Sequence, residues 1–377
     1  MIWKENGEIK LTETDLAVLR STAFADLPWG DPGVWQRVDL RLPPVHAPVL
    51  FTLMTACPPA VEGFWIAHRT VLDCSNHPEN YYVEYEIKTG DRSRPIASPR
   101  YPLLFLQDWI RRNILDRIKP SPNACAYVKG ATLRDHASRH RGKAMMVKLD
   151  VRHFFDSVSY DMVYRVFSRL AGYETAGATL LTHLCCLRGR LPQGAPTSPA
   201  LSNLCMIEPD AAIESYCCSR GITYTRYSDD MIFSADQLDA AALIAFVRDT
   251  LKGYGLSLNA DKTRILGKGA RHLVTGVVCN EKLSVPAAYR RRIRQEMHYL
   301  QKYGAEDHLR RLQDPRFVFP EGTLDCRGYL NSLRGRIAFV LQISPGDREF
   351  MEYARRLKEP GDPDIFLDPN DGDELPF

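Results

Sequence analysis

The stretch GITYTRYSDDMIFSA, residues 221–235, places two neighbouring carboxylates, Asp229 and Asp230, between two short segments rich in β-branched and aromatic residues. Such segments are typical of strands, so the stretch predicts a hairpin with acidic residues at its tip. Side chains alternate across a strand, so the two carboxylates cannot both point into one core. Because like charges repel, a divalent metal ion is the simplest way to neutralise the pair.

A third carboxylate, Asp150, follows the apolar segment AMMVKL at residues 144–149, which predicts a strand. Asp150 and Asp229 together could bridge two Mg²⁺ ions, which prefer oxygen ligands and retain water and phosphate oxygens. Two such ions can activate a nucleic-acid hydroxyl and stabilise a departing pyrophosphate, so the set indicates nucleotidyl transfer. The alternative is structural: Asp150 caps the following turn, and the other two form a polar hairpin tip.

The rest of the chain alternates between strand-like and helix-like patterns. Strands are predicted at residues 81–87, around 94–96, and at 144–149, 256–266 and 272–278. Helices are predicted at residues 10–24, 102–118, 159–170, 198–219, 236–254, 285–303 and 324–341, with Asp236 suited to the N-terminal end of its helix. A turn is predicted at residues 89–91. This order predicts an α+β fold, in which a sheet of ferredoxin-like outline carries helices on one face.

The composition is that of a globular protein, with 45% hydrophobic and 25% charged residues among 377. The net charge is only +3, but residues 357–377 contain seven acidic residues and one lysine. Without them the chain carries 48 Lys and Arg against 39 Asp and Glu, a surplus that suits a polyanionic partner. No apolar run is long enough to span a membrane, and residues 1–5 lack the core of a signal peptide, so we expect a cytoplasmic protein with reduced cysteines.

Three motifs, in the same order, resemble those of reverse transcriptases. They are YSDD at residues 227–230, LDVRHFFD at 149–156, and LPQGAPTSP at 191–199, which runs into LSN at 201–203. The resemblance covers roughly residues 80–345 and implies a right-hand polymerase with fingers, a ferredoxin-like palm and an α-helical thumb. The implied domains are an N-terminal extension (1–80), fingers (81–143), palm with fingers insertions (144–280), thumb (281–345) and an acidic, disordered tail (346–377).

The resemblance also implies roles for single residues. Asp150, Asp229 and Asp230 would be catalytic, and with the Val151 carbonyl they would hold two Mg²⁺ ions, which Mn²⁺ could replace. Phe155 stands at the steric-gate position, where an aromatic ring excludes a ribose hydroxyl. The remaining residues implied in binding the deoxynucleotide are Arg94, Lys88, Gln193 and Lys262. The structural alternatives are a core ring for Phe155, a plain loop for the motif that contains Gln193, and solvated charges for Arg94 and Lys88.

Two further elements resemble retron reverse transcriptases. Residues 272–276, HLVTG, contain the Val-Thr-Gly element, and residues 135–140, DHASRH, are similar to an Asn-Ala-x-x-His element with His136 in place of Asn. The basic helix at 285–303, within a thumb stretch extending to residue 312, suits a nucleic-acid backbone, although a solvated amphipathic helix has the same pattern. RNA contacts are therefore expected from His140, Val274, Thr275, Gly276, Arg290, Arg291, Arg292 and Arg294, although a lone histidine such as His140 is more often structural.

Together these resemblances imply an RNA-directed DNA polymerase of retron type. It would bind a cognate structured non-coding RNA and copy part of it, from deoxynucleotides, into short single-stranded DNA joined to that RNA, known as msDNA. Such systems serve anti-phage defence with an effector protein. Two alternatives remain open: another bacterial defence or group II-like reverse transcriptase making untemplated or protein-primed DNA, and a non-catalytic RNA-binding scaffold.

Overall fold

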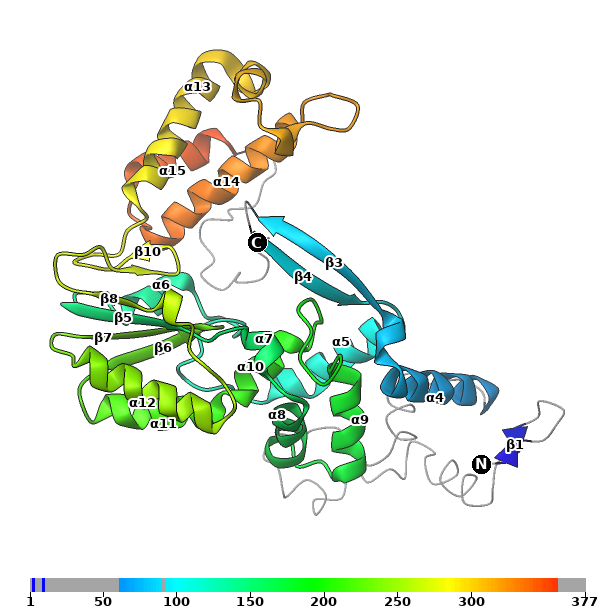
Figure 1. The fold of residues 1–377 in the computed structure, drawn as a ribbon. Helices are drawn as coiled ribbons and strands as arrows, with labels where there is room; N and C mark the ends of the chain where they lie inside the picture. The colour runs from blue at the N-terminus through cyan, green and yellow to red at the C-terminus, as the bar shows by residue number, and fades with distance from the viewer. Residues whose placement is uncertain (1, 4–8, 11–60, 90–91, 359–377) are drawn as a thin grey trace. The chain divides into compact units, whose positions relative to one another are not determined.

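The computed structural model describes residues 2–3, 9–10, 61–89 and 92–358 (Figure 1). The predicted helix at 10–24, most of the N-terminal extension, the centre of the turn at 89–91 and the acidic residues from 359 onward lie outside this range. The chain divides into two compact units. The first comprises Met1–Ile118, Tyr160–Arg188 and Gly194–Thr197, and the second comprises Lys119–Ser159, Gly189–Gln193 and Ser198–Phe377. The expected boundary at residue 143 is thus not a unit boundary, because residues 119–143 group with the palm.

The first unit contains a long hairpin and a group of helices. Strands β3 (Tyr82–Thr89) and β4 (Arg92–Pro99) pair antiparallel, as their alternating patterns predict. Four helices accompany them: α4 (Val61–Asn76), α5 (Leu103–Asn113), α8 (Tyr160–Arg165), which continues as a π-helix over Val166–Leu170, and α9 (Thr175–Cys185). The buried Gln107 amide donates to the Tyr82 hydroxyl at 2.8 Å and to the Leu184 carbonyl at 2.7 Å. These bonds join the start of β3 to α5 and α9.

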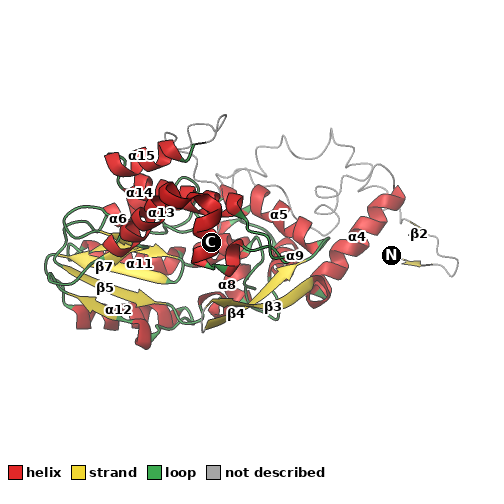
Figure 2. Ribbon diagram, turned by 90° about the horizontal axis from the view of Figure 1, so that it is seen from above, coloured by secondary structure: helices red, strands yellow, loops and turns green. Residues whose placement is uncertain are grey.

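A four-stranded antiparallel sheet forms the centre of the second unit. Its order is β6 (Thr223–Tyr227), β7 (Asp230–Ala235), β5 (Met145–Asp150) and β8 (Arg264–Leu266). Helices α10 (Ser198–Cys205) and α11 (Ile207–Cys218) precede β6, and α12 (Ala240–Gly253) connects β7 to β8. This order of strands and helices is that of the predicted ferredoxin-like palm. Figures 1 and 2 show α11 and α12 along one face of the sheet.

Several predicted elements differ in detail. The single helix expected at 198–219 is broken at Met206, which has the non-helical angles φ −92° and ψ 1°. The helix expected to start at Asp236 starts at Ala240, because the Asp239 carboxylate accepts a hydrogen bond from the Ala242 N–H and caps it. The strand expected at 256–266 is interrupted by a 3₁₀ turn, Ala260–Lys262, so that β8 is a strand whereas Leu258 forms a single β-bridge with Val151.

The strand expected at 272–278 is instead a small hairpin of β9 (Leu273–Val274) and β10 (Val277–Val278). Thr275 and Gly276 reverse the chain between them with φ values of 43° and 83°. Positive φ at both central residues is the requirement of a type I′ turn, which favours glycine at the second position. The short helix α6 (Leu133–Ser138) packs against both strands.

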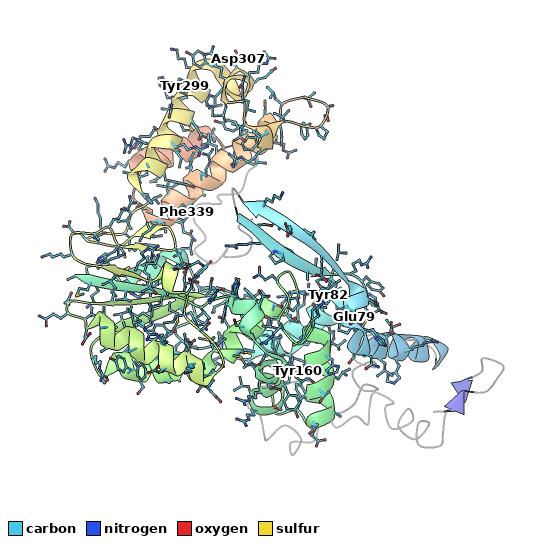
Figure 3. The ribbon with its side chains drawn as sticks, viewed as in Figure 1. Glu79, Tyr82, Tyr160, Tyr299, Asp307 and Phe339 are labelled. Carbon is cyan, nitrogen blue, oxygen red and sulfur yellow. The ribbon has the colours of Figure 1, made fainter. Side chains whose placement is uncertain are left out.

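Three helices follow the palm: α13 (Ala287–Leu312), α14 (Cys326–Ile343) and α15 (Arg348–Arg356). Figure 3 labels Tyr299 and Asp307 on α13 and Phe339 on α14. Helix α13 is kinked at Gly304, where φ is 78°. The prediction of a disordered tail from 346 was wrong for its first part, because α15 buries Phe350 completely. None of the helices in the described ranges is long and apolar enough to cross a membrane.

Candidate active site

The acidic hairpin turns through two residues, Ser228 and Asp229, between the paired residues Tyr227 and Asp230. Ser228 has a φ of 58°, which is uncommon for a residue with a side chain. Two contacts hold this turn. A guanidinium N–H of Arg226 donates to the Ser228 carbonyl at 3.0 Å, and the Tyr127 hydroxyl lies 3.4 Å from the Ser228 hydroxyl. The tip of the predicted hairpin is therefore held by contacts with Arg226 and Tyr127.

The three predicted carboxylates meet at one end of the palm sheet. Asp150, the last residue of β5, lies directly opposite Asp230, the first residue of β7. The Val151 N–H donates to the Asp229 carbonyl at 3.0 Å, which joins the two chain segments beyond the strands. Asp150 is buried, whereas Asp229 and Asp230 are half-buried. The side chains of residues far apart in sequence are thus brought together as the motif spacing predicts.

The surroundings of these carboxylates oppose accumulation of negative charge. Burial, and then the neighbouring Asp150 and Asp230 carboxylates, raise the pKa of Asp229 above its ordinary value. Burial also raises the pKa of Asp230, although Lys148 acts in the opposite direction. A group of ionised carboxylates whose pKa values are raised in this way is stabilised by a nearby cation.

A lysine supplies one such cation. Lys262 Nζ lies 2.6 Å from Asp150 Oδ2, so the lysine expected at the leaving group is brought to the carboxylates. With the side chains in this arrangement, no group of three or more His, Cys, Asp or Glu residues within the described ranges is placed to hold a metal ion. The fit to Mg²⁺ therefore rests on the chemistry of the oxygen donors, and metal binding stays a prediction.

The Val151 carbonyl is available as a further oxygen donor. Asn259 N–H donates to the Asp150 carbonyl and Arg152 N–H donates to the Ser257 carbonyl, each at 2.8 Å. These two bonds flank Val151, whose own carbonyl takes no part in that pairing. The predicted backbone ligand is thus compatible with the local strand geometry.

Phe155 and Gln193 also belong to the second unit. Phe155 follows β5, and Gln193 precedes α10. Phe155 belongs to the short helix α7 (Phe154–Ser157) and is half-buried, with its ring centroid 5.8 Å from that of Phe154. Gln193 is half-buried in the loop that follows Leu191, whose N–H lies 3.4 Å from the Val158 carbonyl. The roles predicted for Phe155 and Gln193 remain predictions.

Gly194 belongs to the first unit and shows why this loop needs glycine. Its φ is 116°, and a Cβ there would lie 2.8 Å from Ile96 Cγ2 and 2.9 Å from the Ala97 carbonyl oxygen. Both the backbone conformation and the close approach of β4 therefore exclude a side chain.

Lys88 and Arg94 are both exposed on the hairpin of the first unit. In the strand register Arg94 lies opposite Ile87, and Lys88 lies opposite Ser93. Neighbouring pairs point to opposite faces of a two-stranded sheet, so Lys88 and Arg94 point to different sides. The structure does not bring these two predicted nucleotide-binding residues together.

Two predicted RNA contacts lie in the protein core. His140 is fully buried, and its ring nitrogens lie 2.7 Å from Ser234 Oγ and 2.6 Å from Thr225 Oγ1. Val274 is also fully buried. Direct contact of these side chains with RNA was therefore a wrong expectation, because neither is accessible. Thr275 is half-buried and Gly276 is exposed, so the turn itself can meet a partner.

The thumb arginines differ in how far they are already paired. Arg290 pairs with Asp347, the residue before α15, at 2.5 Å. Arg294 pairs with Glu349 on α15 at 2.7 Å, so both arginines tie α13 to this part of the chain. Arg292 pairs with the buried Glu296 at 3.1 Å but remains 62% exposed. Arg291 is exposed. Arg291 and Arg292 are thus better placed than the other two to meet a nucleic-acid backbone.

Sequence reasoning missed a buried ionic network beneath the hairpin. Arg226 and Asp210 are completely buried and lie 2.8 Å apart. Arg226 also donates to Asn203 Oδ1 at 3.1 Å, and the Tyr224 hydroxyl donates to Asp210 Oδ1 at 2.7 Å. The available signal was an arginine in an apolar strand next to the acidic motif, but the sequence does not show which helix supplies its partner.

The comparison with known families decides the classification. The family described as "Reverse transcriptase (RNA-dependent DNA polymerase)" matches residues 88–300, which include all four palm strands and all three carboxylates. The chain belongs to the reverse transcriptase family. This confirms the predicted right-hand polymerase fold class and the resemblance on which it rested.

Three curated relatives are retron reverse transcriptases. The chain is 36% identical over 211 residues to the Retron Ec86 reverse transcriptase of Escherichia coli, covering 55% of this chain and 66% of that protein. The identity is 31% over 246 residues to the Retron Mx162 enzyme of Myxococcus xanthus, with 57% and 50% covered. It is 29% over 301 residues to the Retron Mx65 enzyme of that organism, with 74% and 65% covered. The matches span one half to just under two thirds of these relatives.

Among solved structures, telomerase from Candida albicans aligns with a TM-score of 0.39 and 12% identity, covering 75% of this chain and 61% of that chain. This likeness is too weak to support an inference about function. The predicted retron type rests instead on the curated relatives.

Proposed function

We propose that the protein is an RNA-directed DNA polymerase of retron type. The observation that carries this proposal is the meeting of Asp150, Asp229 and Asp230 at adjacent strand ends, with Lys262 2.6 Å from Asp150, inside the region that matches reverse transcriptases. Two divalent metal ions, when bound, would supply Lewis-acid activation of the primer hydroxyl and stabilisation of the pyrophosphate. Asp150, Asp229, Asp230 and the Val151 carbonyl would hold them.

The remaining steps belong to residues of the chain. Phe155 would exclude the ribose hydroxyl of a ribonucleotide, and Gln193 would contact the incoming nucleotide or the template. Lys262 would neutralise or protonate the leaving pyrophosphate, because an ammonium group at the edge of the carboxylate cluster can move towards a new anion. Arg94 would bind the triphosphate, since a guanidinium fork matches phosphate oxygens.

The finer proposal concerns the product. By its likeness to retron enzymes, the protein would prime from a hydroxyl of a cognate structured RNA and make short DNA that stays joined to that RNA. An RNA partner is supported by the accessible turn at Thr275 and Gly276 and by the exposed Arg291. We further propose that the protein acts with an effector protein in anti-phage defence.

Co-purified nucleic acid tests this proposal. The protein is isolated from cells that carry its native locus, and the bound nucleic acid is treated with RNase or DNase and sequenced. The expected product is DNA complementary to a co-purified RNA and covalently joined to it. DNA without an RNA complement would favour the untemplated alternative, and RNA without any DNA would favour the scaffold.

A further inference from the structure

A chain of hydrogen bonds crosses the palm behind the acidic hairpin. His136 and His140, on and just after α6, both approach Thr225 Oγ1 with their Nε2 atoms, at 2.8 Å and 2.6 Å. His140 Nδ1 lies 2.7 Å from Ser234 Oγ, and His136 Nδ1 lies 3.4 Å from Thr275 Oγ1. This series of hydrogen bonds therefore runs from Ser234 on β7 through Thr225 on β6 to the turn between β9 and β10.

The two imidazoles are neutral in this setting. Both histidines are buried, at 2% and 0% exposure. Burial lowers the pKa of His136 to about 4 and that of His140 to about 3. A neutral imidazole has one donor and one acceptor nitrogen, and the Thr225 hydroxyl has a single hydrogen. When the Thr225 hydroxyl donates to one of these ring nitrogens it can only accept from the other, and every hydrogen in the series then points the same way.

The direction of this chain is coupled to what Thr275 meets. If Thr275 donates its hydrogen to an RNA phosphate, its oxygen is left to accept from His136 Nδ1–H. His136 Nε2 then accepts from Thr225, Thr225 accepts from His140, and His140 accepts from Ser234. In the opposite direction every one of these bonds is reversed. Contact at the turn can thus select one of two tautomer states in the core.

His136 also touches the catalytic motif. Its ring is stacked on Tyr227, with centroids 5.8 Å apart and planes at 10°. Tyr227 is the last residue of β6 and pairs with Asp230, the first residue of β7. The ring that is hydrogen-bonded to Thr275 therefore packs on the residue that precedes the acidic turn.

We propose that His136 is a positioning residue that connects the Thr275–Gly276 turn, where a nucleic-acid phosphate or hydroxyl binds, to Tyr227 and the acidic hairpin. This rests on the proposed function, because it takes the substrate to be nucleic acid. His136 acts through Tyr227 and does not touch the reacting atoms. The loss of the Thr275 hydroxyl and the loss of the His136 hydrogen bonds should therefore have the same consequence at the hairpin.

Three variants separate this role from general damage to the core. His136→Phe keeps an aromatic ring against Tyr227 but removes both hydrogen bonds, Thr275→Val removes only the hydroxyl, and the third variant combines them. His183→Phe is the matched control, since the His183 ring lies in the first unit, with Nδ1 3.2 Å from the Ser75 carbonyl and an edge-to-face contact with Tyr160. Each protein is assayed for dTTP incorporation on poly(rA)·oligo(dT), and kcat and KM for dTTP are determined.

Each single variant should lower kcat about tenfold, with less change in KM for dTTP, because small misplacement of reacting groups is costly. The double variant should be no slower than His136→Phe, because both changes interrupt one chain. The inference would be overturned if the two single losses in kcat multiplied in the double variant, or if Thr275→Val kept the wild-type kcat. Loss of incorporation by the wild-type protein would instead count against the proposed polymerase function.

Nitrogen NMR of the histidine rings gives a second readout that does not depend on activity. In wild type, each ring should have one protonated nitrogen at neutral pH. In Thr275→Val, His136 Nδ1 loses its hydroxyl partner and should become the unprotonated nitrogen, with the proton on Nε2 directed to Thr225. His140 should then carry its proton on Nδ1. A population of His136 protonated on Nδ1 in this variant would contradict the coupled chain.

Discussion

The ammonium of Lys262 lies 2.6 Å from a carboxylate oxygen of Asp150. The two side chains differ in solvation: that of Asp150 is 5% exposed, whereas that of Lys262 is 49% exposed. The lysine can therefore leave the pair for solvent or for another anion at lower cost than the aspartate can. This arrangement would let Lys262 neutralise Asp150 in the free protein and, in the proposed reaction, interact with the leaving pyrophosphate.

Replacement of Lys262 by methionine should have two separable effects. Because the ammonium and a divalent cation compete for the same oxygen, Lys262→Met should lower the Mg²⁺ concentration that gives half-maximal dTTP incorporation. The kcat should nevertheless fall by about 10²-fold, since general acid assistance to the leaving group is lost. A Mg²⁺ titration of primer extension measures both quantities. A higher Mg²⁺ requirement with an unchanged kcat would contradict this role.

Phe155 should determine discrimination between deoxyribonucleotides and ribonucleotides. Phe155→Ala removes the half-buried ring, so a ribose hydroxyl no longer meets a steric barrier. We expect the ratio of kcat/KM for dTTP over UTP to fall by at least about tenfold, because the barrier acts on one substrate alone. Single-nucleotide incorporation with each substrate measures this ratio. An equal loss for both nucleotides would show that the ring only supports the core.

The buried pair of Arg226 and Asp210 should be important for stability. Arg226→Met leaves the Asp210 carboxylate buried without its cation, which costs about 3–5 kcal/mol. Arg220→Met is the matched control: Arg220 is exposed just after α11, the helix that carries Asp210, and its replacement should change the free energy of unfolding by about 0.5 kcal/mol or less. Urea unfolding measures both. A loss below about 1 kcal/mol for Arg226→Met would contradict the assigned burial cost.

The neutral histidine pair predicts a specific pH dependence of stability. The pKa values of His136 and His140 are lowered to about 4 and about 3 in the folded protein, whereas an unfolded histidine titrates near its ordinary value. The unfolded state therefore binds more protons as the pH falls below about 6.5, so the free energy of unfolding should decrease. The contribution of each histidine is about 2 kcal/mol between about pH 7 and about pH 5.

His140→Gln tests this pH dependence, because glutamine retains hydrogen-bonding groups but does not titrate. Urea unfolding of wild type and variant at the two pH values should show a smaller loss of stability on acidification for the variant. The same loss in both proteins would mean that His140 is not buried as a neutral base.

The local pattern of the sequence was sufficient for the elements nearest the chemistry. The alternation around Asp229, the apolar strand before Asp150 and the three ordered motifs predicted the hairpin, the palm strand and their meeting. These features are local in sequence, and their resemblance to a known family supplied the pairing of distant segments. The helix boundaries near Met206 and Asp239 were not predicted, because a break of one residue leaves the apolar periodicity almost unchanged.

Features that depend on distant partners could not be predicted in the same way. The basic pattern of α13 gave no sign that Arg290 and Arg294 pair with acidic residues of and just before α15. The residues of the Val-Thr-Gly element were predicted as one strand, whereas Thr275 and Gly276 turn the chain with positive φ. His140 was expected at the RNA, but packing against Thr225 and Ser234 buries it. In each case tertiary contacts decide the outcome.

Asp229→Asn tests whether the three carboxylates form a polymerase site. The substitution keeps the size of the side chain but removes its charge, whereas Asp261→Asn makes the same change at an exposed aspartate beside Lys262. The measurement is Mg²⁺-dependent dTTP incorporation on poly(rA)·oligo(dT), with urea unfolding to establish that both variants are folded. We expect wild-type incorporation for Asp261→Asn and a loss of at least about 10³-fold for Asp229→Asn. Incorporation by Asp229→Asn at the wild-type rate would contradict a polymerase site at these carboxylates.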